Sequence, residues 1–352
     1  MKLKKYMILI LICVLGCMLI VVGCEKSDSK KEPKEPTTVT IIDSAGNEVK
    51  ILHPVNRIIT LTADNTELAI VLGDEDKIVG VSDEAVNYAE IGDKLTRAAT
   101  VGHFREPNLE KIAVLKPDVV IGYETSIEKG IKDKLESMGI PFIVCECNKF
   151  ETFEKDVELM GRILGKEDKA KEFLTFHHSV MNMIKERTKN IRPDQRTQVY
   201  LSGGWGKEPC VTFGKESDIN LYLNTVGAIN IASELPGNKI TVSPEWVLTQ
   251  DNIEVIIDHI ASTQIKPTTE PLIEVKKIYM SDPVWAKTTA AREGRVHIMG
   301  WRVYKGLRFS IGLLYCAKWC HPNLFNDIDP EKYHSEYMQK FLGLELQNVW
   351  GQ

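Results

Sequence analysis

Short apolar runs alternate with amphipathic segments along most of the chain. The runs that predict β-strands lie at residues 39–42, 49–52, 57–61, 77–82, 118–121, 141–145, 198–202, 254–258 and 296–299. The first two runs flank turn residues at 43–47, which predicts a hairpin. Helical segments stand between the other runs, among them 64–73, 126–138 and 308–319. Strand–helix–strand repetition at this spacing favours mainly parallel sheets that are covered by helices on both faces.

The middle of the chain interrupts this alternation. From residue 151 to about 189 the strand pattern is absent, and apolar residues recur at helical spacing on both sides of Gly165. This predicts two helices, of which the second is long and has no partner strand. We therefore expect an α/β fold of two Rossmann-like lobes with mainly parallel sheets. The lobes, residues 38–150 and 191–352, would be joined by linking helices at 151–190 that include a long backbone helix, and should move only modestly against each other.

The first residues predict export and a lipid anchor. A basic start precedes an apolar run at residues 6–22, and the chain turns abruptly polar after Cys24. This break resembles a bacterial lipobox, in which the cysteine is diacylated and becomes the mature N-terminus. We expect a signal peptide at residues 1–23 and lipidation of Cys24, which would hold the protein on the extracytoplasmic face of the cell membrane. Cys17 also fits the pattern, and an uncleaved membrane anchor is the other interpretation of the apolar run.

Beyond this anchor, the composition predicts a tether, and the net charge bears on which partners the protein can bind. Residues 24–37 consist largely of Lys, Glu, Ser and Pro, which predicts a flexible tether. The chain has 44 basic and 49 acidic residues and a net charge of −5; without the three lysines of the signal segment the net charge is −8. An acidic protein without a basic stripe is a poor partner for a phosphate backbone, so no nucleic acid is expected as a partner.

Five cysteines follow Cys24, and an odd number cannot all pair within one chain. They are Cys145, Cys147, Cys210, Cys316 and Cys320. Cys316 and Cys320 are one helical turn apart and His321 follows, so these residues could bind a metal ion together. A structural metal site needs about four ligands, so we expect none here and interpret these cysteines as small packing residues.

Two short motifs, Asn-Leu-Glu at 108–110 and Lys-Pro-Asp at 116–118, stand within a longer series of ordered segments. The others lie at 56–61, 65–67, 72–73, 78–81, 138–141 and 242–248. Together they resemble the helical-backbone class of periplasmic binding proteins, which serve importers of iron-siderophore complexes, haem and cobalamin. The resemblance covers about residues 38–342. It implies an extracytoplasmic protein that delivers its ligand to the membrane subunits of an ABC importer.

The resemblance also implies two permease-docking residues. Members of this family use one acid on each lobe to engage arginines of the importer, at positions that match Glu110 and Glu245 in this chain. An exposed carboxylate loses little while it is solvated and gains a bidentate, charge-assisted bond when an arginine arrives. The alternative is that each acid only favours the dipole of the short helix that it opens.

Ligands of doubly wound α/β lobes lie beyond the carboxyl ends of the strands. The predicted ligand-binding residues in those segments are Asp64, His103, Phe104, Arg105, Tyr123, Gly204, Trp205, Trp301, Arg302 and Tyr304. Aromatic faces suit a large flat or catecholate-bearing ligand. Arg105 and Arg302, with Arg308 as a further candidate, suit its carboxylates or phenolates. We therefore expect an iron complex, such as a ferric siderophore-like chelate, as the ligand, and no resident cofactor.

Other ligands and other classes of protein stay open. His103 or Tyr123 could hold a haem iron axially, and aromatic walls at Phe104 and Tyr123 would suit cobalamin. Ser202, His103 and Asp64 could be arranged as a hydrolase triad, but the chain has no G-x-S-x-G, H-E-x-x-H or Walker motif, so an enzyme is not expected. A carrier of bare metal ions would need several converging histidines and carboxylates, and no His-rich loop occurs.

Overall fold

The computed structural model describes residues 36–250, 252–261, 270–346 and 351. The predicted signal peptide, Cys24 and the predicted tether up to residue 35 lie outside the described residues. Within the described ranges, no helix combines the length and the apolar character that a membrane span requires.

Five parallel strands form the first sheet, in the order β5-β4-β3-β8-β9. Their bounds are β3 Ile58–Thr60, β4 Ile78–Val81, β5 Ala99–Thr100, β8 Val119–Gly122 and β9 Phe142–Val144. The strands β3, β8 and β9 are buried along their whole lengths, as expected for a sheet covered on both faces. The chain winds outward from β3 in both directions, so the strand order reverses between β3 and β8. Such a reversal opens a crevice at the carboxyl ends of the two strands.

The helices that accompany this sheet are α2 Ala63–Val71, α3 Asp83–Val86, α4 Ala89–Gly92, α5 Leu109–Leu115, α6 Thr125–Glu128 and α7 Ile131–Ser137. Thr62 caps α2, because its side chain accepts a hydrogen bond from the backbone N–H of Asn65. The single helix expected at 126–138 is wrong. Gly130 adopts a left-handed conformation with φ of 67° and divides the segment into α6 and α7.

Four parallel strands form the second sheet, in the order β12-β10-β14-β15. Their bounds are β10 Thr197–Leu201, β12 Ala228–Asn230, β14 Val255–Ile260 and β15 Val296–Gly300. The helices of this part are α10 Ile219–Thr225, α11 Pro244–Leu248, α12 Glu270–Ser281, α13 Thr289–Arg292, α14 Trp301–Tyr304 and α15 Phe309–Cys320. The strand order reverses between β10 and β14, so this sheet also has a crevice at its carboxyl ends.

Three antiparallel strand pairs are added to the two sheets, and the third encloses α10 and β12 in the chain between its two strands. They are β1 Thr37–Ile42 with β2 Glu48–His53, β6 Gly102–His103 with β7 Glu106–Pro107, and β11 Val211–Phe213 with β13 Lys239–Thr241. The first confirms the predicted hairpin. Its turn is stabilised by the Asp43 carboxylate, which accepts hydrogen bonds from the backbone N–H groups of Ala45, Asn47 and Val144. The bond from Val144 ties the tip of the hairpin to the end of β9.

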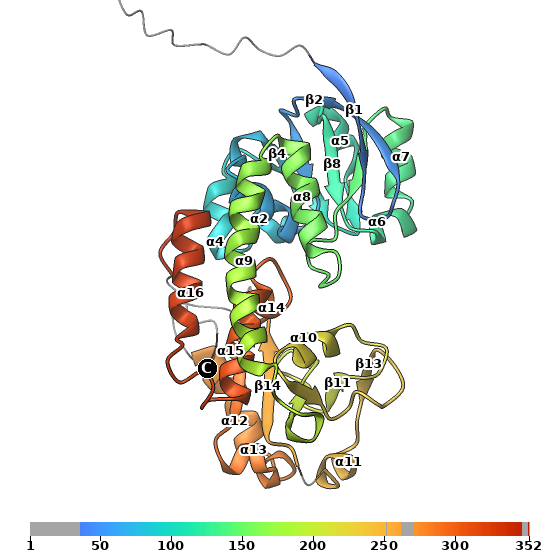
Figure 1. Cartoon of the computed structure of the whole chain (residues 1–352). Helices are drawn as coiled ribbons and strands as arrows, with labels where there is room; N and C mark the ends of the chain where they lie inside the picture. The colour runs from blue at the N-terminus through green and yellow to red at the C-terminus, as the bar shows by residue number, and fades with distance from the viewer. Residues whose placement is uncertain (1–35, 251, 262–269, 347–350, 352) are drawn as a thin grey trace, which may run out of the picture. The chain divides into compact units, whose positions relative to one another are not determined.

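The predicted linking helices are α8 Phe153–Leu164 and α9 Glu167–Thr188, and α9 has 22 residues. Gly165 ends α8 in a left-handed conformation, with φ of 68°. Helix α8 contacts α2 near the first sheet, and α9 contacts α10 and α15 near the second (Figure 1). The predicted fold class, two α/β parts with parallel sheets joined by a long helix, is therefore confirmed. The numerical lobe boundaries stay predictions.

The chain returns toward the first sheet after α15. Helix α16 Pro330–Tyr337 and the π-helical turn η6 Met338–Leu342 follow it, and η6 contacts α2. Phe173 and Phe176 of α9 contact the ring of Phe341 at centroid distances of 5.3 and 5.5 Å. The sequence pattern predicts no element in this segment.

Candidate functional site

A cleft of about 210 Å³ lies where strand ends of the two sheets meet. It is lined by Thr62, Ala63, Asp64, Glu84, Tyr88, Phe104, Tyr123, Asn148, Trp301, Arg302 and Lys305. A larger groove of about 540 Å³ runs along α8 and α9, but its lining contains no Phe, Tyr or Trp and lies away from the strand ends. The cleft is the better candidate, because α/β folds hold their ligands beyond the carboxyl ends of strands where the strand order reverses.

Asp64 lines the cleft from the first turn of α2. Tyr123 Oη donates a hydrogen bond to Asp64 Oδ2, and Arg302 Nη2 lies 3.8 Å from Asp64 Oδ1. Burial raises the pKa of the Asp64 carboxyl, and the nearby Arg302 and the hydrogen bond from Tyr123 only partly offset this effect. The Arg302 guanidinium also lies 4.1 Å from the centre of the Tyr88 ring. The cleft therefore presents a guanidinium that is held between a carboxyl group and an aromatic face.

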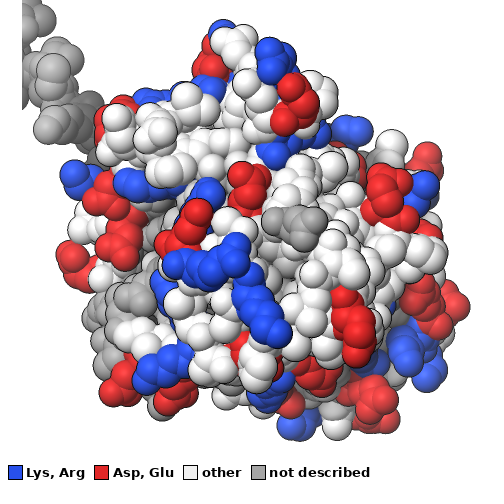
Figure 2. Space-filling model, turned by 90° about the horizontal axis from the view of Figure 1, so that it is seen from below, with Lys and Arg blue, Asp and Glu red and all other residues white. Residues whose placement is uncertain are grey.

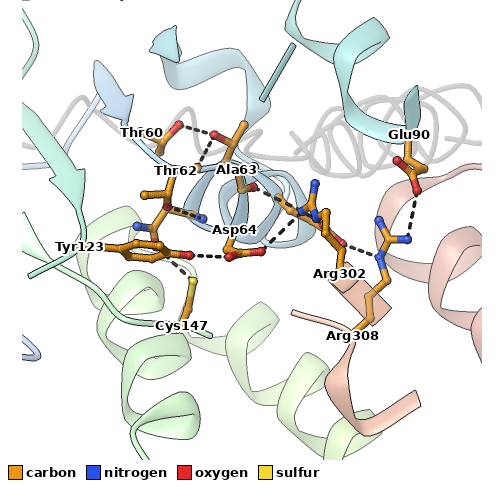
Figure 3. Close-up of polar contacts among 12 residues, drawn as sticks. Thr60, Thr62, Ala63, Asp64, Glu90, Tyr123, Cys147, Arg302 and Arg308 are labelled. Carbon is orange, nitrogen blue, oxygen red and sulfur yellow. Dashed lines mark hydrogen bonds and ion pairs between the residues drawn. The ribbon is translucent and has the colours of Figure 1, made fainter. Parts of the chain in front are cut away.

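A buried ion-pair cluster lies behind the cleft and joins the two parts of the fold (Figure 3). Glu67 of α2 binds Arg302 of α14, and its Oε1 accepts hydrogen bonds from Arg308 Nε and Tyr337 Oη, both at 2.8 Å. Arg308 Nη1 also lies 3.3 Å from Glu90 Oε1. Burial alone would raise the pKa of Glu67, but Arg302 and Arg308 outweigh this effect and hold it at about 2. The cluster therefore keeps its charges while fully buried, and it fixes Arg302 where that residue enters the cleft.

Five of the predicted ligand-binding residues line the cleft: Asp64, Phe104, Tyr123, Trp301 and Arg302. His103 and Arg105 lie beside it on the β6–β7 hairpin and are exposed. His103 Nε2 is 2.9 Å from Glu84 Oε1, and the Arg105 guanidinium lies 5.0 Å from the centre of the Phe104 ring.

The other predicted contacts are not among the lining residues. Gly204 and Tyr304 are buried, and Trp205 is half-buried with its ring 4.8 Å from that of Trp301. Arg308 is buried in the ion-pair cluster, with a side chain that is 0% exposed. None of these four residues lines the cleft, and their role in binding stays a prediction.

Six lining residues are not among the predicted contacts. Thr62 and Ala63 directly precede the predicted Asp64, and the other four are Glu84, Tyr88, Asn148 and Lys305. Lys305 Nζ is 2.7 Å from Asp218 Oδ2, so this cation is already paired at the rim. Tyr88 and Glu84 lie on or next to the short helices α3 and α4, which the apolar pattern does not reveal. Lys305 could have been predicted from the sequence, because it lies five residues after Gly300, the last residue of β15.

Metal-binding groups are sparse in the part of the chain that the structure describes. No three His, Cys, Asp or Glu side chains within it are close enough together to hold a metal ion. Cys316 and Cys320 are free and buried, and His321 Nε2 lies 3.2 Å from the backbone oxygen of Gly227. Burial raises the pKa of both thiols, which disfavours the thiolate that a metal requires.

The two predicted docking acids are exposed. Glu110 lies in the first turn of α5, which Asn108 caps through a hydrogen bond of 2.8 Å from the Lys111 N–H. Glu245 lies in the first turn of α11, which Ser243 caps. Hydrogen bonds from its own backbone N–H and from Ser243 lower the pKa of Glu245, so this carboxyl is ionised at neutral pH.

Charges are mixed on the face of the molecule shown in Figure 2. Among the described residues visible there, acidic and basic side chains alternate with neutral ones, and neither sign covers a broad continuous area. This face offers no extended basic surface of the kind that follows a phosphate backbone.

Comparison with known proteins agrees with this architecture. The model of a family described as periplasmic binding protein matches residues 58–302, which is more than half of the chain. The chain belongs to this family. It is accordingly a substrate-binding protein of an ABC transporter that works outside the cytoplasm, and proteins of this family bind ligands rather than catalyse reactions.

Two relatives show how far the similarity extends. The uncharacterized ABC transporter substrate-binding lipoprotein YvrC of Bacillus subtilis is 29% identical over 248 residues, which cover 66% of this chain and 77% of YvrC. The molybdate-binding protein MolA of Haemophilus influenzae is 23% identical over 331 residues, which cover 86% of this chain and 90% of MolA.

Solved structures support the same fold. MolA bound to molybdate superimposes with a TM-score of 0.73 at 20% identity, over 88% of this chain and all of MolA. The TroA-like periplasmic binding protein FepB of Veillonella parvula superimposes with a TM-score of 0.77 at 20% identity, over 89% of this chain and 99% of FepB. At this level of identity the likeness shows that the fold is shared. It does not show which ligand this chain binds.

Proposed function

We propose that this periplasmic binding protein carries an anionic metal complex, of the ferric siderophore type, in the cleft between its two sheets. The observation that supports this most is the combination of aromatic rings and cations around one cleft. Tyr88, Phe104, Tyr123 and Trp301 provide flat faces. Arg302 and Lys305 contribute cations to the same lining, each held in place by a neighbouring carboxylate. Ferric catecholate chelates offer matching flat and anionic surfaces, because each catecholate is an aromatic dianion. Cobalamin and haem are the alternative metal complexes, since both have large flat faces.

A compact oxyanion such as molybdate is a second candidate. The cleft volume of about 210 Å³ is below the roughly 300–1,000 Å³ typical of pockets that enclose drug-sized ligands. A siderophore complex would therefore project from the cleft, whereas a tetrahedral oxyanion would fit inside it beside Arg302. A relative that is 23% identical over 86% of this chain, MolA, is named a molybdate-binding protein and provides the precedent for such a ligand.

A panel of ligands separates these proposals. The full chain, purified in detergent, is titrated with a ferric tris-catecholate, a ferric tris-hydroxamate, haemin, cobalamin, molybdate and free ferric iron. We expect a ferric chelate to quench tryptophan fluorescence at micromolar concentration or below, because Trp301 lines the cleft. Trp301→Phe should reduce the quenching, and Trp246→Phe, which changes a tryptophan of α11 outside the cleft lining, should not. Binding of molybdate alone would favour the oxyanion, and binding of none of these ligands would contradict both candidates.

We also propose that the protein is attached to the membrane through diacylated Cys24. Cells that express Cys24→Ser should incorporate no radiolabelled palmitate into the protein, because the acceptor sulfur is gone, and should release it from the membrane fraction. Cys17→Ser is the matched control and should keep both the label and the membrane attachment. The reverse result would assign the lipid to Cys17, and a label in both variants would contradict single-site lipidation.

A further inference from the structure

The cations of the cleft lining differ in how firmly each is held by its own carboxylate. Among the described residues that line the cleft, the cations are Arg302 and Lys305. Arg302 binds Glu67 inside the ion-pair cluster, where the two side chains are 3% and 1% exposed. Separating this pair would leave buried charges without a partner, which is strongly unfavourable. A ligand in the cleft therefore cannot take Arg302 away from Glu67.

The ion pair of Lys305 is of a different kind. Lys305 Nζ lies 3.0 and 2.7 Å from Asp218 Oδ1 and Oδ2. The two side chains are 18% and 37% exposed, so water reaches both of them. An ion pair in contact with water contributes little to stability, and its partners separate at small cost. Lys305 is therefore the lining cation that can change its partner when an anion enters the cleft.

Asp218 is placed so that it can leave Lys305 without becoming a stranded charge. It is not among the residues that line the cleft, and it directly precedes α10. An aspartate at this N-cap position commonly accepts a hydrogen bond from the first turn of its helix. Asp218 makes no such bond, because its carboxylate is directed to Lys305. Once released, the carboxylate would remain in contact with water and beside the first N–H groups of α10.

Lys305 shares its part of the cleft with an aromatic ring. Trp301, Arg302 and Lys305 all line the cleft from α14 and the residue that follows it. A flat ring face and an exchangeable cation in one wall match an aromatic anion such as a catecholate, and the cation alone matches a compact oxyanion. The shared chemistry of both ligands is an anionic oxygen that can replace a carboxylate.

We propose that Asp218 is a built-in competitor for the ligand: it occupies Lys305 in the empty protein and gives it up to an anionic oxygen of the bound ligand. One ion pair breaks and another forms, and neither a covalent bond nor a proton is exchanged. The inference rests on the proposed function, since it requires an anionic ligand. It makes Asp218 a specificity-determining residue, because a neutral chelate cannot replace its carboxylate and leaves the ion pair intact.

The test measures affinities of the full chain in detergent by titration calorimetry. Ferric tris-catecholate and molybdate are the anionic probes, and a ferric tris-hydroxamate is the neutral one. Asp218→Asn keeps the size of the side chain and removes the competing charge. We expect it to tighten binding of whichever anion the protein binds by at least about threefold, and to give the neutral chelate no such gain. Glu216→Gln, the matched control, removes an exposed acid two residues away and should change every affinity by less than twofold.

Two further variants show whether Asp218 acts through Lys305. Lys305→Met should weaken anion binding at least about tenfold, with circular dichroism as the check that the variant is folded. Asp218→Asn added to Lys305→Met should give no tightening, because the contested cation is gone. Tightening that persists without Lys305, or that is equal for the neutral chelate, would indicate a general effect of charge and overturn the inference.

The inference and the proposed function can fail separately. If wild type binds an anionic probe and Asp218→Asn binds it equally or more weakly, the inference is overturned and the proposed function stands. If wild type binds neither ferric tris-catecholate nor molybdate, the inference and the anionic-ligand proposal fall together.

Discussion

Replacing Glu67 by alanine should lower the free energy of unfolding by about 3–5 kcal/mol, the usual cost of removing one partner from a buried ion-pair cluster. The change leaves Arg302 and Arg308 buried without their shared counter-charge, and it removes the acceptor of the Tyr337 hydroxyl. Urea unfolding followed by tryptophan fluorescence measures the loss.

The pKa of Glu67 is lowered from 4.5 to about 2, so the stabilisation that its charge provides is fully present above pH 4.5 and is lost as the pH falls through about 2. The difference between wild type and variant should therefore be constant from pH 5 to pH 8.

Two controls isolate the burial of the charges. Asp76→Ala removes an acid that pairs with Arg97 on the surface, where both side chains are more than 80% exposed, and should cost less than about 1 kcal/mol. Replacing Glu67 with Leu, Glu90 with Gln and both arginines with Met removes the charges of the cluster together and should recover most of the loss, because neither buried acid is then left without its arginine. A loss below about 1 kcal/mol for Glu67→Ala would mean that water reaches the cluster, which would contradict its burial.

Removing both predicted docking acids should separate transport from binding. In cells, Glu110→Ala combined with Glu245→Ala should reduce ligand uptake at least tenfold, because each exposed carboxylate would lose a charge-assisted bond to the importer and a loss of about 1.4 kcal/mol already gives a factor of ten. The affinity of the purified protein should stay within twofold, since neither residue lines the cleft. Uptake of the radiolabelled chelate by cells and fluorescence titration of the protein measure the two effects.

The matched control changes two exposed acids away from α5 and α11. Glu128→Ala combined with Glu216→Ala removes the same charge and should leave uptake unchanged. A similar fall in uptake with this pair would indicate a general effect of net charge. Equal losses of affinity and uptake with the Glu110 and Glu245 pair would show that these acids support the fold or the cleft instead of docking.

The fold was largely predictable because its central elements are long or fully buried. Apolar runs bounded by turn residues predict β3, β8, β9 and β14, and helical spacing across Gly165 predicts α8 and α9. The short strands β6, β7 and β13 carry little apolar periodicity, since several of their residues are exposed, and the pattern does not show them. Gly130 marks the break between α6 and α7, but a glycine inside a helical pattern only sometimes ends a helix.

The candidate site was predictable to a lesser extent. Asp64, Tyr123 and Trp301 follow strand ends, and strand ends can be read from the sequence. The same rule selects Tyr304, which the structure buries, because a position after a strand does not tell which way a side chain points. Glu67 lies in the segment 65–67 that contributes to the family resemblance, and nothing local marks it as the centre of a buried cluster.

By itself, the sequence determined the alternation of strands and helices, the helical interruption between two parallel sheets and the gathering of aromatic and charged residues at strand ends, because each of these follows from local periodicity. Only the tertiary structure decided which polar side chains meet. Glu67 lies 235 residues from Arg302 and 270 from Tyr337 along the chain, and His259 is closed in by rings from three other segments. Such pairings depend on how distant segments are arranged in space. Burial then determines whether a charged side chain is stabilised by a partner and whether an imidazole stays neutral.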